Sequence, residues 1–168
     1  MFRRSPIRVE RGERLLADAV AAEGHVGGTR DALYFLRRRG GTLELAETTR
    51  IPWEEVEAAE WDSDTAVLRV SEVGSWGEDR PVHRFTIEEP GRLLELVRER
   101  VTASVVLQRH VPLDGRRGLR VIARRAPRGD RPVQWFHEYD AGIDPADPAV
   151  RKAAEEALDA ARADVGPV

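Results

Sequence analysis

Short apolar stretches recur between turn signals from residue 12 to residue 87, and this recurrence constrains the fold more than any other feature of the sequence. The stretches are rich in Val, Leu, Ile, Trp, Tyr and Phe, which is typical of an antiparallel sheet or barrel. We expect strands over residues 13–22, 26–37, 42–53, 56–62, 65–73 and 81–87. The glycine pairs Gly27-Gly28 and Gly40-Gly41 are interpreted as turns.

Each of these stretches has one apolar side. Leu68 and Val70 lie on the side opposite Val67, Arg69 and Ser71, and His83, Phe85 and Ile87 share a side in the last stretch. Each strand is therefore expected to bury one face. Two tryptophans on strand patterns are expected in the core, Trp53 and Trp61.

The spacing of the apolar residues changes after Pro90. Apolar and small residues then fall at helical spacing, at Leu93, Leu94, Val97, Val101, Ser104 and Val105. The spacing predicts one amphipathic helix from residue 90 to about residue 108, with Pro90 in its first turn.

A hairpin and a second helix are predicted after residue 112. Residues 118–126 and 131–139 have strand patterns, and the turn residues 127–130 between them favour a hairpin. Asp147 has the position of an N-cap, Pro148 that of the first helical residue, and an alanine-rich apolar stripe follows.

Length and composition set the class of protein. The chain has 168 residues, of which 41% are hydrophobic and none is cysteine. One core with an appendage is expected, and disulfides, zinc–thiolate sites and iron–sulfur clusters are excluded. No apolar run reaches the roughly 18 residues of a membrane span. The N-terminus turns charged before a signal-peptide core forms, so we expect a cytoplasmic protein without a transmembrane segment.

Two short motifs resemble those of bacterial pleckstrin-homology (PH)-like and GRAM-like proteins. The first is Thr29-Arg30-Asp31-Ala32-Leu33-Tyr34, and the second is Ile51-Pro52-Trp53-Glu54-Glu55-Val56. Antiparallel strands followed by one amphipathic helix is also the order of elements in the PH superfold. The resemblance covers roughly residues 12–108.

The resemblance implies an α+β protein with an antiparallel barrel capped by an amphipathic helix. The domains are then an N-terminal arm (1–11), a PH-like domain (12–110), and a C-terminal hairpin and helix packed on it (111–168). Phosphoinositide binding is not carried over, because residues 23–30 between the first two strand patterns hold a single arginine.

Catalytic and metal-binding patterns are not found in the sequence. The histidines His25, His83, His110 and His137 lack the spacings of metal ligands, and no serine stands in a nucleophile motif. We expect no cofactor, no metal and no enzymatic activity. An enzyme with a cleft between the barrel and the C-terminal helix remains a minor alternative.

Arginine dominates the middle of the chain. Residues 91–131 carry 11 basic and 4 acidic residues, a net charge of +7 between two acidic segments. The candidate anion- or partner-binding residues are Arg109, Arg116, Arg117, Arg120, Arg124, Arg125, Arg128 and Arg131, with Trp135 at the edge of the basic face. The competing interpretation is that these arginines pair with acidic residues of the same chain.

One further tryptophan, Trp76, lies in a loop of small and charged residues and is a candidate interface anchor. It could equally fold back over the end of the barrel.

The function expected from these features is a non-catalytic binding or scaffold module with a protein partner. Binding of RNA or the ribosome through the arginine-rich hairpin, residues 109–131, is the alternative. The sequence leaves open whether the chain forms a homodimer.

Overall fold

The computed structural model describes residues 4–40, 47–74 and 79–167. The chain divides into two compact units, Met1–Ala103 and Ser104–Val168, which we call unit 1 and unit 2. The boundary expected from the sequence, between residues 110 and 111, falls inside a strand, because Val105–Asp114 forms β8 of unit 2.

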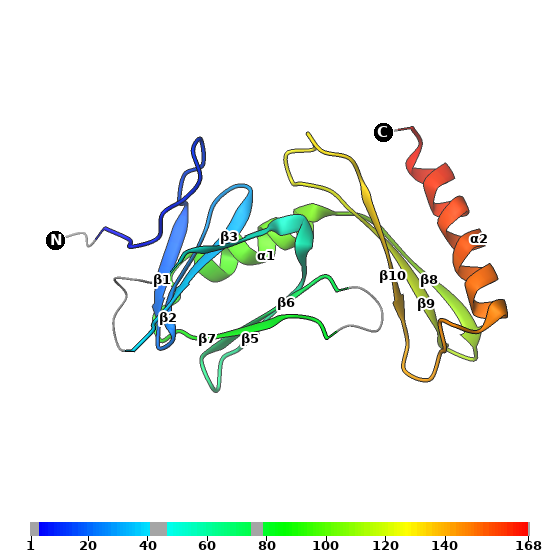
Figure 1. Ribbon diagram of the computed structural model, residues 1–168, viewed down its shortest axis with the longest axis horizontal. Helices are drawn as coiled ribbons and strands as arrows, with labels where there is room; N and C mark the ends of the chain where they lie inside the picture. The colour runs from blue at the N-terminus through cyan, green and yellow to red at the C-terminus, as the bar shows by residue number, and fades with distance from the viewer. Residues whose placement is uncertain (1–3, 41–46, 75–78, 168) are drawn as a thin grey trace. The chain divides into compact units, whose positions relative to one another are not determined.

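Unit 1 consists of two antiparallel sheets and a helix (Figure 1). In its described residues one sheet has the strand order β1-β2-β3-β4 and the other β5-β6-β7. The strands are β1 (Ala17–Ala21), β2 (Gly24–Gly28), β3 (Ala32–Arg37), β4 (Thr49–Pro52), β5 (Val56–Asp62), β6 (Val67–Glu72) and β7 (Val82–Thr86). A 3-10 helix, η1 (Trp53–Glu55), joins the two sheets, and α1 (Leu93–Ser104) follows them.

The core of unit 1 joins both sheets to α1. Trp53 is fully buried and its Nε1 donates to the carbonyl oxygen of Thr29 at 3.0 Å. Leu93 and Val97 place α1 on the same cluster as the strands. The predicted burial of Leu68, Val70, Phe85 and Ile87 is confirmed, and Trp61 packs against the cluster.

The stretch expected as one strand over residues 26–37 is two strands, so that prediction is wrong. Thr29 makes the turn between β2 and β3, because its Oγ1 accepts hydrogen bonds from the amides of Asp31 and Ala32, each at 3.1 Å. Gly27 and Gly28 are strand residues and not a turn.

The two glycines of β2 permit close packing on both faces of the strand. A Cβ on Gly27 would lie 3.0 Å from Ile7 Cδ1, and one on Gly28 would lie 2.8 Å from Leu96 Cδ2. The first neighbour belongs to the N-terminal arm, residues 4–11, and the second to α1. All five residues of β2 are buried.

The N-terminal arm is held by contacts to β3. Ile7 is buried in a small cluster with Ala32, Tyr34 and Leu36, and the amide of Glu10 donates to Tyr34 Oη at 3.2 Å. The arm therefore covers the face of the β1–β4 sheet that α1 does not cover.

Helix α1 ends at Ser104 and not near residue 108, so the predicted C-terminal end is wrong. Val105 and Val106 lie in β8, where Val105 pairs with Arg124 and the amide of Arg125 donates to the carbonyl oxygen of Ser104 at 2.9 Å. β-Branched residues favour strands, and the pairing with β9 overrides the helical spacing.

Unit 2 is a three-stranded antiparallel sheet of order β10-β9-β8, with α2 packed on it (Figure 1). β9 (Arg117–Arg124) and β10 (Gln134–Tyr139) form the predicted hairpin. The predicted helix is confirmed as α2 (Pro148–Val165), with the Asp147 side chain accepting from the amide of Ala149 at 2.7 Å.

The chain is an α+β protein. Its described residues form three antiparallel sheets and two α-helices, and these sheets do not close into a barrel.

Candidate functional site

The strand register of unit 2 separates the sequence-predicted site residues onto two faces of the sheet. Directly paired residues share a face, and neighbours along a strand alternate. Trp135 pairs with Ala123, which pairs with Leu107, and this row lies on the side of α2. Arg120 and Arg124 lie on the opposite face.

Trp135 therefore does not lie beside Arg120 and Arg124 as an aromatic edge of a basic face. It is half-buried in the cluster under α2, where the guanidinium of Arg162 lies 6.0 Å from its ring centroid. The sequence predicts a basic face with Trp135 at its edge. The strand register instead places Trp135 on the opposite face of the sheet from Arg120 and Arg124.

Several of the candidate arginines contact carboxylates of unit 2. Arg109 pairs with Asp164 of α2, Arg117 pairs with Asp114 at 2.7 Å, and Arg120 pairs with Glu138 at 3.1 Å. These contacts match the competing interpretation, in which the arginines neutralise acidic residues of the same chain. Exposed pairs of this kind contribute little to stability, about 0 to 1 kcal/mol each.

Arg124 is buried, with 5% of its surface exposed, and its guanidinium donates to Ser104 Oγ at 3.2 Å. This hydrogen bond joins Ser104, the last residue of α1, to β9.

The remaining candidate arginines lie in turns and connections. Arg116 is exposed between β8 and β9, and Arg128 and Arg131 are exposed in the connection between β9 and β10, where Arg125 is half-buried. The structure thus brings Arg125, Arg128 and Arg131 into one connection. Trp76 lies outside the described residues.

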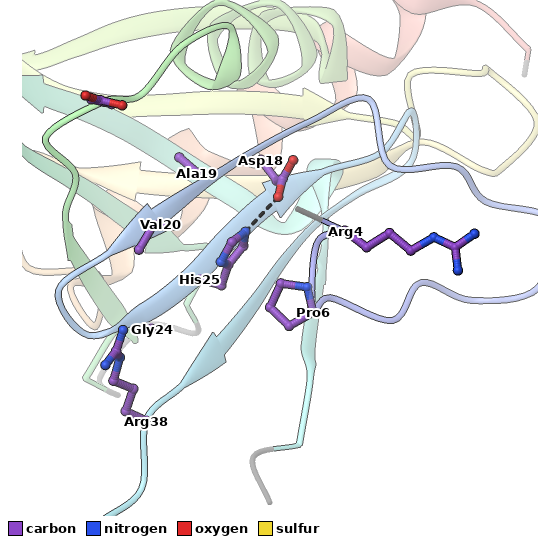
Figure 2. Close-up of a pocket in the computed structure, with 9 residues that line it drawn as sticks. Arg4, Pro6, Asp18, Ala19, Val20, Gly24, His25 and Arg38 are labelled. Carbon is purple, nitrogen blue, oxygen red and sulfur yellow. Dashed lines mark hydrogen bonds and ion pairs between the residues drawn. The ribbon is translucent and has the colours of Figure 1, made fainter. Parts of the chain in front are cut away.

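Unit 1 carries a different candidate site, at the hairpin of β1 and β2. The turn at residues 22–23 pairs Val20 with His25, so Asp18 lies diagonally across from His25 on the same face. His25 Nε2 and Asp18 Oδ2 are 2.6 Å apart (Figure 2). His25 is 9% exposed, whereas about a third of the Asp18 side chain is exposed.

A pocket of about 380 Å³ opens at this pair. Figure 2 shows Asp18 and His25 pointing toward each other, with Arg4 and Arg38 on opposite sides of them. Val20 and Glu89 also line the pocket. A neighbouring hollow shares Val20, Arg38 and Glu89 with it, so the two hollows adjoin.

The C-terminal end of the N-terminal arm meets a network of polar and charged groups, since Glu10 contacts both Tyr34 and Arg50. Tyr34 Oη donates to Glu13, and Arg50 donates to Tyr34 Oη at 3.0 Å and to Glu13 Oε1 at 2.6 Å. Burial and the Glu13 carboxylate raise the pKa of Tyr34. Burial alone would lower the pKa of Arg50, but the bonds to Glu13 and Tyr34 raise it.

A second carboxylate fixes the other end of the hairpin. Glu23 accepts from the amide of Thr86 at 2.8 Å and from its hydroxyl at 2.9 Å. Burial would raise the pKa of Glu23, but the hydrogen bonds from Thr86 and the charge of Arg37 outweigh burial and lower the pKa. These bonds tie the β1–β2 turn to the end of β7.

The described residues contain neither a metal-binding cluster nor a membrane-spanning helix. Across residues 4–40, 47–74 and 79–167, His, Asp and Glu do not gather in a group of three or more able to hold a metal ion. None of the helices in that part of the chain is long and apolar enough to cross a membrane.

No protein-family model matches this chain, and no curated protein matches it in sequence.

Most residues of the unit 1 pocket stand in no motif of the sequence. The sequence offers His25 only as a metal ligand and Glu89 only as part of the acidic pair Glu88-Glu89, interpreted as solvated charge, and it gives Arg4, Asp18 and Arg38 no role. One signal was available: a two-residue turn at 22–23 places Asp18 and His25 on one face. No such signal places the N-terminal arm or Arg38 at the pocket, because their positions there depend on tertiary packing.

Proposed function

We propose that this chain is a non-catalytic, PH-like binding or scaffold module of the bacterial cytoplasm, with another protein as its ligand. The observation that carries the proposal is the order of elements in unit 1. Four described strands form one antiparallel sheet, three form a second, and α1 follows and contributes to the buried cluster that both sheets share. This order resembles the bent pair of sheets with a C-terminal helix that defines the PH superfold.

The two sequence motifs that suggested the resemblance both lie in unit 1. The first spans the turn from β2 into β3, and the second spans the end of β4 and η1. Both supply core residues, among them Leu33, Ile51 and Trp53. They support a shared fold, and fold alone does not define a ligand.

Binding of RNA through unit 2 is the alternative. It is favoured by the exposed arginines Arg116, Arg128 and Arg131 and opposed by the pairing of Arg109, Arg117 and Arg120 with carboxylates. RNA binding through such residues would weaken steeply with salt, because phosphate contacts release counterions.

The test is affinity purification of the full chain from lysate, with and without nuclease, followed by binding of the purified components. A protein that survives nuclease and binds the purified chain at fixed stoichiometry supports the proposal. The variant that reverses Arg116, Arg125, Arg128 and Arg131 to glutamate, and leaves the buried Arg124 in place, is compared in parallel.

The outcomes separate the two candidates. Recovery of RNA that nuclease and the four-arginine reversal both abolish would replace the proposal with the RNA alternative. If neither a protein nor RNA is recovered, the proposal of a binding module is rejected. If a protein partner is found, Trp76→Ala tests whether the loop tryptophan anchors it.

A further inference from the structure

The sheet of unit 2 has two edge strands, and they differ in how well they are protected against pairing with a further strand. In the described residues β9 lies between β8 and β10, so each outer strand has one free edge. β8 carries register shifts between Val105 and Leu107 and between Pro112 and Asp114, and it contains a proline. Bulges and prolines hinder pairing at a sheet edge. β10 has neither, since its six residues pair with β9 without a shift.

The free edge of β10 presents the backbone groups of Trp135, His137 and Tyr139. The amide of Asp140 donates to the carbonyl oxygen of Gly118 at 2.9 Å, so Asp140 directs its backbone toward β9. Backbone groups alternate in direction along an antiparallel strand, so those of the three residues point away from β9. No strand of the described residues pairs with them. This edge can therefore accept one more strand.

Half-buried aromatic rings lie on both faces of β10. Trp135 and Tyr139 share the face on which α2 lies, but α2 packs on β8 and β9, so both rings stay partly exposed. Phe136 is half-buried on the opposite face. Aromatic side chains are enriched in protein interfaces, and a strand added to β10 would cover all three rings.

The sequence of β10 is complementary to itself. When two copies pair antiparallel about a two-fold axis at His137, Trp135 of one copy lies opposite Tyr139 of the other, and the two histidines lie opposite each other. Each of these opposed pairs exchanges two backbone hydrogen bonds, so every outward-facing group of the three residues gains a partner. The cross-strand aromatic pairs add further stabilisation.

Charge also permits this pairing. On the other face Phe136 of one copy lies opposite Glu138 of the second copy, and Glu138 pairs with Arg120 of its own chain at 3.1 Å. Gln134 is uncharged and lies opposite Asp140. The pairing therefore places no two carboxylates directly opposite each other, which would destabilise the sheet. We propose that the chain forms a homodimer in which β10 pairs with β10 of a second copy and joins the two unit 2 sheets into one.

This interface goes beyond the proposed protein-binding function and does not rest on it, because the purified full chain alone tests it. Sedimentation velocity at pH 8 over about 1 to 500 µM measures the mass. It should rise from the 18.8 kDa of one chain toward twice that value. A single edge strand forms a small interface, so we expect a Kd of about 10–100 µM.

The variant that tests the edge directly is His137→Pro. It removes the central outward-facing amide and should weaken dimerisation at least about tenfold. His137→Ala keeps the amide and removes only the ring, so its effect should be smaller.

The control for the proline lies on the other edge of the same sheet. Ile122 directs its backbone toward β10, so Gln108, its neighbour on β8, points its amide outward. Gln108 is exposed, and Gln108→Pro should leave dimerisation unchanged. Circular dichroism melting checks that all three variants fold.

Amide hydrogen exchange provides a second test on the unaltered chain. The amides of Trp135, His137 and Tyr139 should exchange slowly at about 500 µM and rapidly at about 1 µM, because only the dimer covers them. The amides of Phe136 and Glu138 bond to β9 and should be protected at both concentrations.

Three results would overturn the proposal. The first is a chain that stays monomeric up to about 500 µM. The second is a dimer that forms equally well in the folded His137→Pro variant. The third is a dimer whose concentration-dependent protection lies only at amides outside β10.

Discussion

The two units of the chain build their cores from different residues. Unit 1 buries large side chains between two sheets and a helix, including Trp53, Leu33 and Phe85. In unit 2 a single sheet is covered by α2 through Ala154, Ala157 and Ala161. Leu119 is the unit 2 residue among the largest fully buried side chains of the described residues.

This difference separates two ways of stabilising a fold. Burying a large apolar side chain contributes about 1.5 to 3 kcal/mol, and alanine contributes much less because it removes little area from water. Unit 1 therefore depends on burial. Unit 2 depends more on the close approach of α2 to the sheet and on the N-cap of α2. It also depends on polar contacts such as the hydrogen bond from the Gly118 amide to the Asp140 carboxylate.

The largest expected effect is the loss of Trp53. Trp53→Ala removes a fully buried ring and the hydrogen bond to Thr29, and should lower the free energy of unfolding by about 3–5 kcal/mol. Urea denaturation followed by circular dichroism measures the change. Trp135→Ala in unit 2 is the matched variant, and its loss should be smaller because that ring is half-buried. Equal losses would contradict the comparison.

The second effect tests whether the alanine core is tightly packed. Ala161 is fully buried on α2, so Ala161→Leu should overpack the interface with the sheet and destabilise the chain by about 1–3 kcal/mol. The adjacent Ala160 is exposed, and Ala160→Leu should leave the unfolding midpoint in urea unchanged. A more stable Ala161→Leu variant would mean that the helix covers a void.

The third effect is the cap of α2. Asp147→Ala removes the acceptor for the amide of Ala149 and should destabilise unit 2 by about 1 kcal/mol, seen as a lower Tm. Asp159→Ala removes the same charge from an exposed position within the helix and is the control. If both variants lose equally, the effect is one of charge and not of capping.

The smallest expected effect is the loss of folding stability in acid that comes from Asp140. A hydrogen bond from the Gly118 amide, followed by one from His110, lowers the pKa of Asp140 below its ordinary value. The ionised carboxylate therefore stabilises the folded state above the unfolded pKa, and this contribution is lost as pH falls through the lower folded pKa.

Asp140→Asn tests this contribution by urea denaturation at a series of pH values. The stability difference from wild type should be constant near neutral pH and shrink below about pH 4. Asp159→Asn should show no such change. A difference that persists in strong acid would show that the Asp140 carboxylate does not carry the effect.

Much of the fold could be predicted where the local sequence agrees with the tertiary structure. The β9–β10 hairpin and the N-cap Asp147 are examples, because turn residues and a capping aspartate act through neighbouring backbone groups. The turn at Thr29 was missed because its hydrogen bonds come from one side chain beside a glycine pair. The end of α1 was missed because valines fit both helical spacing and a strand.

The candidate sites were harder to predict than the fold. The arginine run is visible in the sequence, but which arginines share a face with Trp135 depends on the strand register. Which of them meet a carboxylate depends on α2, through Asp164, and on β10, through Glu138. That the C-terminal elements pack on the N-terminal ones stays a prediction.

The two glycines of β2 have a consequence for the opening motions of unit 1. β2 is hydrogen-bonded to β1 and β3 and buried along its whole length. Its amides can exchange with solvent only when neighbouring strands separate, so they belong among the slowest to exchange in the unit. Because the arm and α1 approach Gly27 and Gly28 so closely, a separation of β2 from its neighbouring strands also disturbs these two layers. Exchange at this strand then reports on the arm and the helix together.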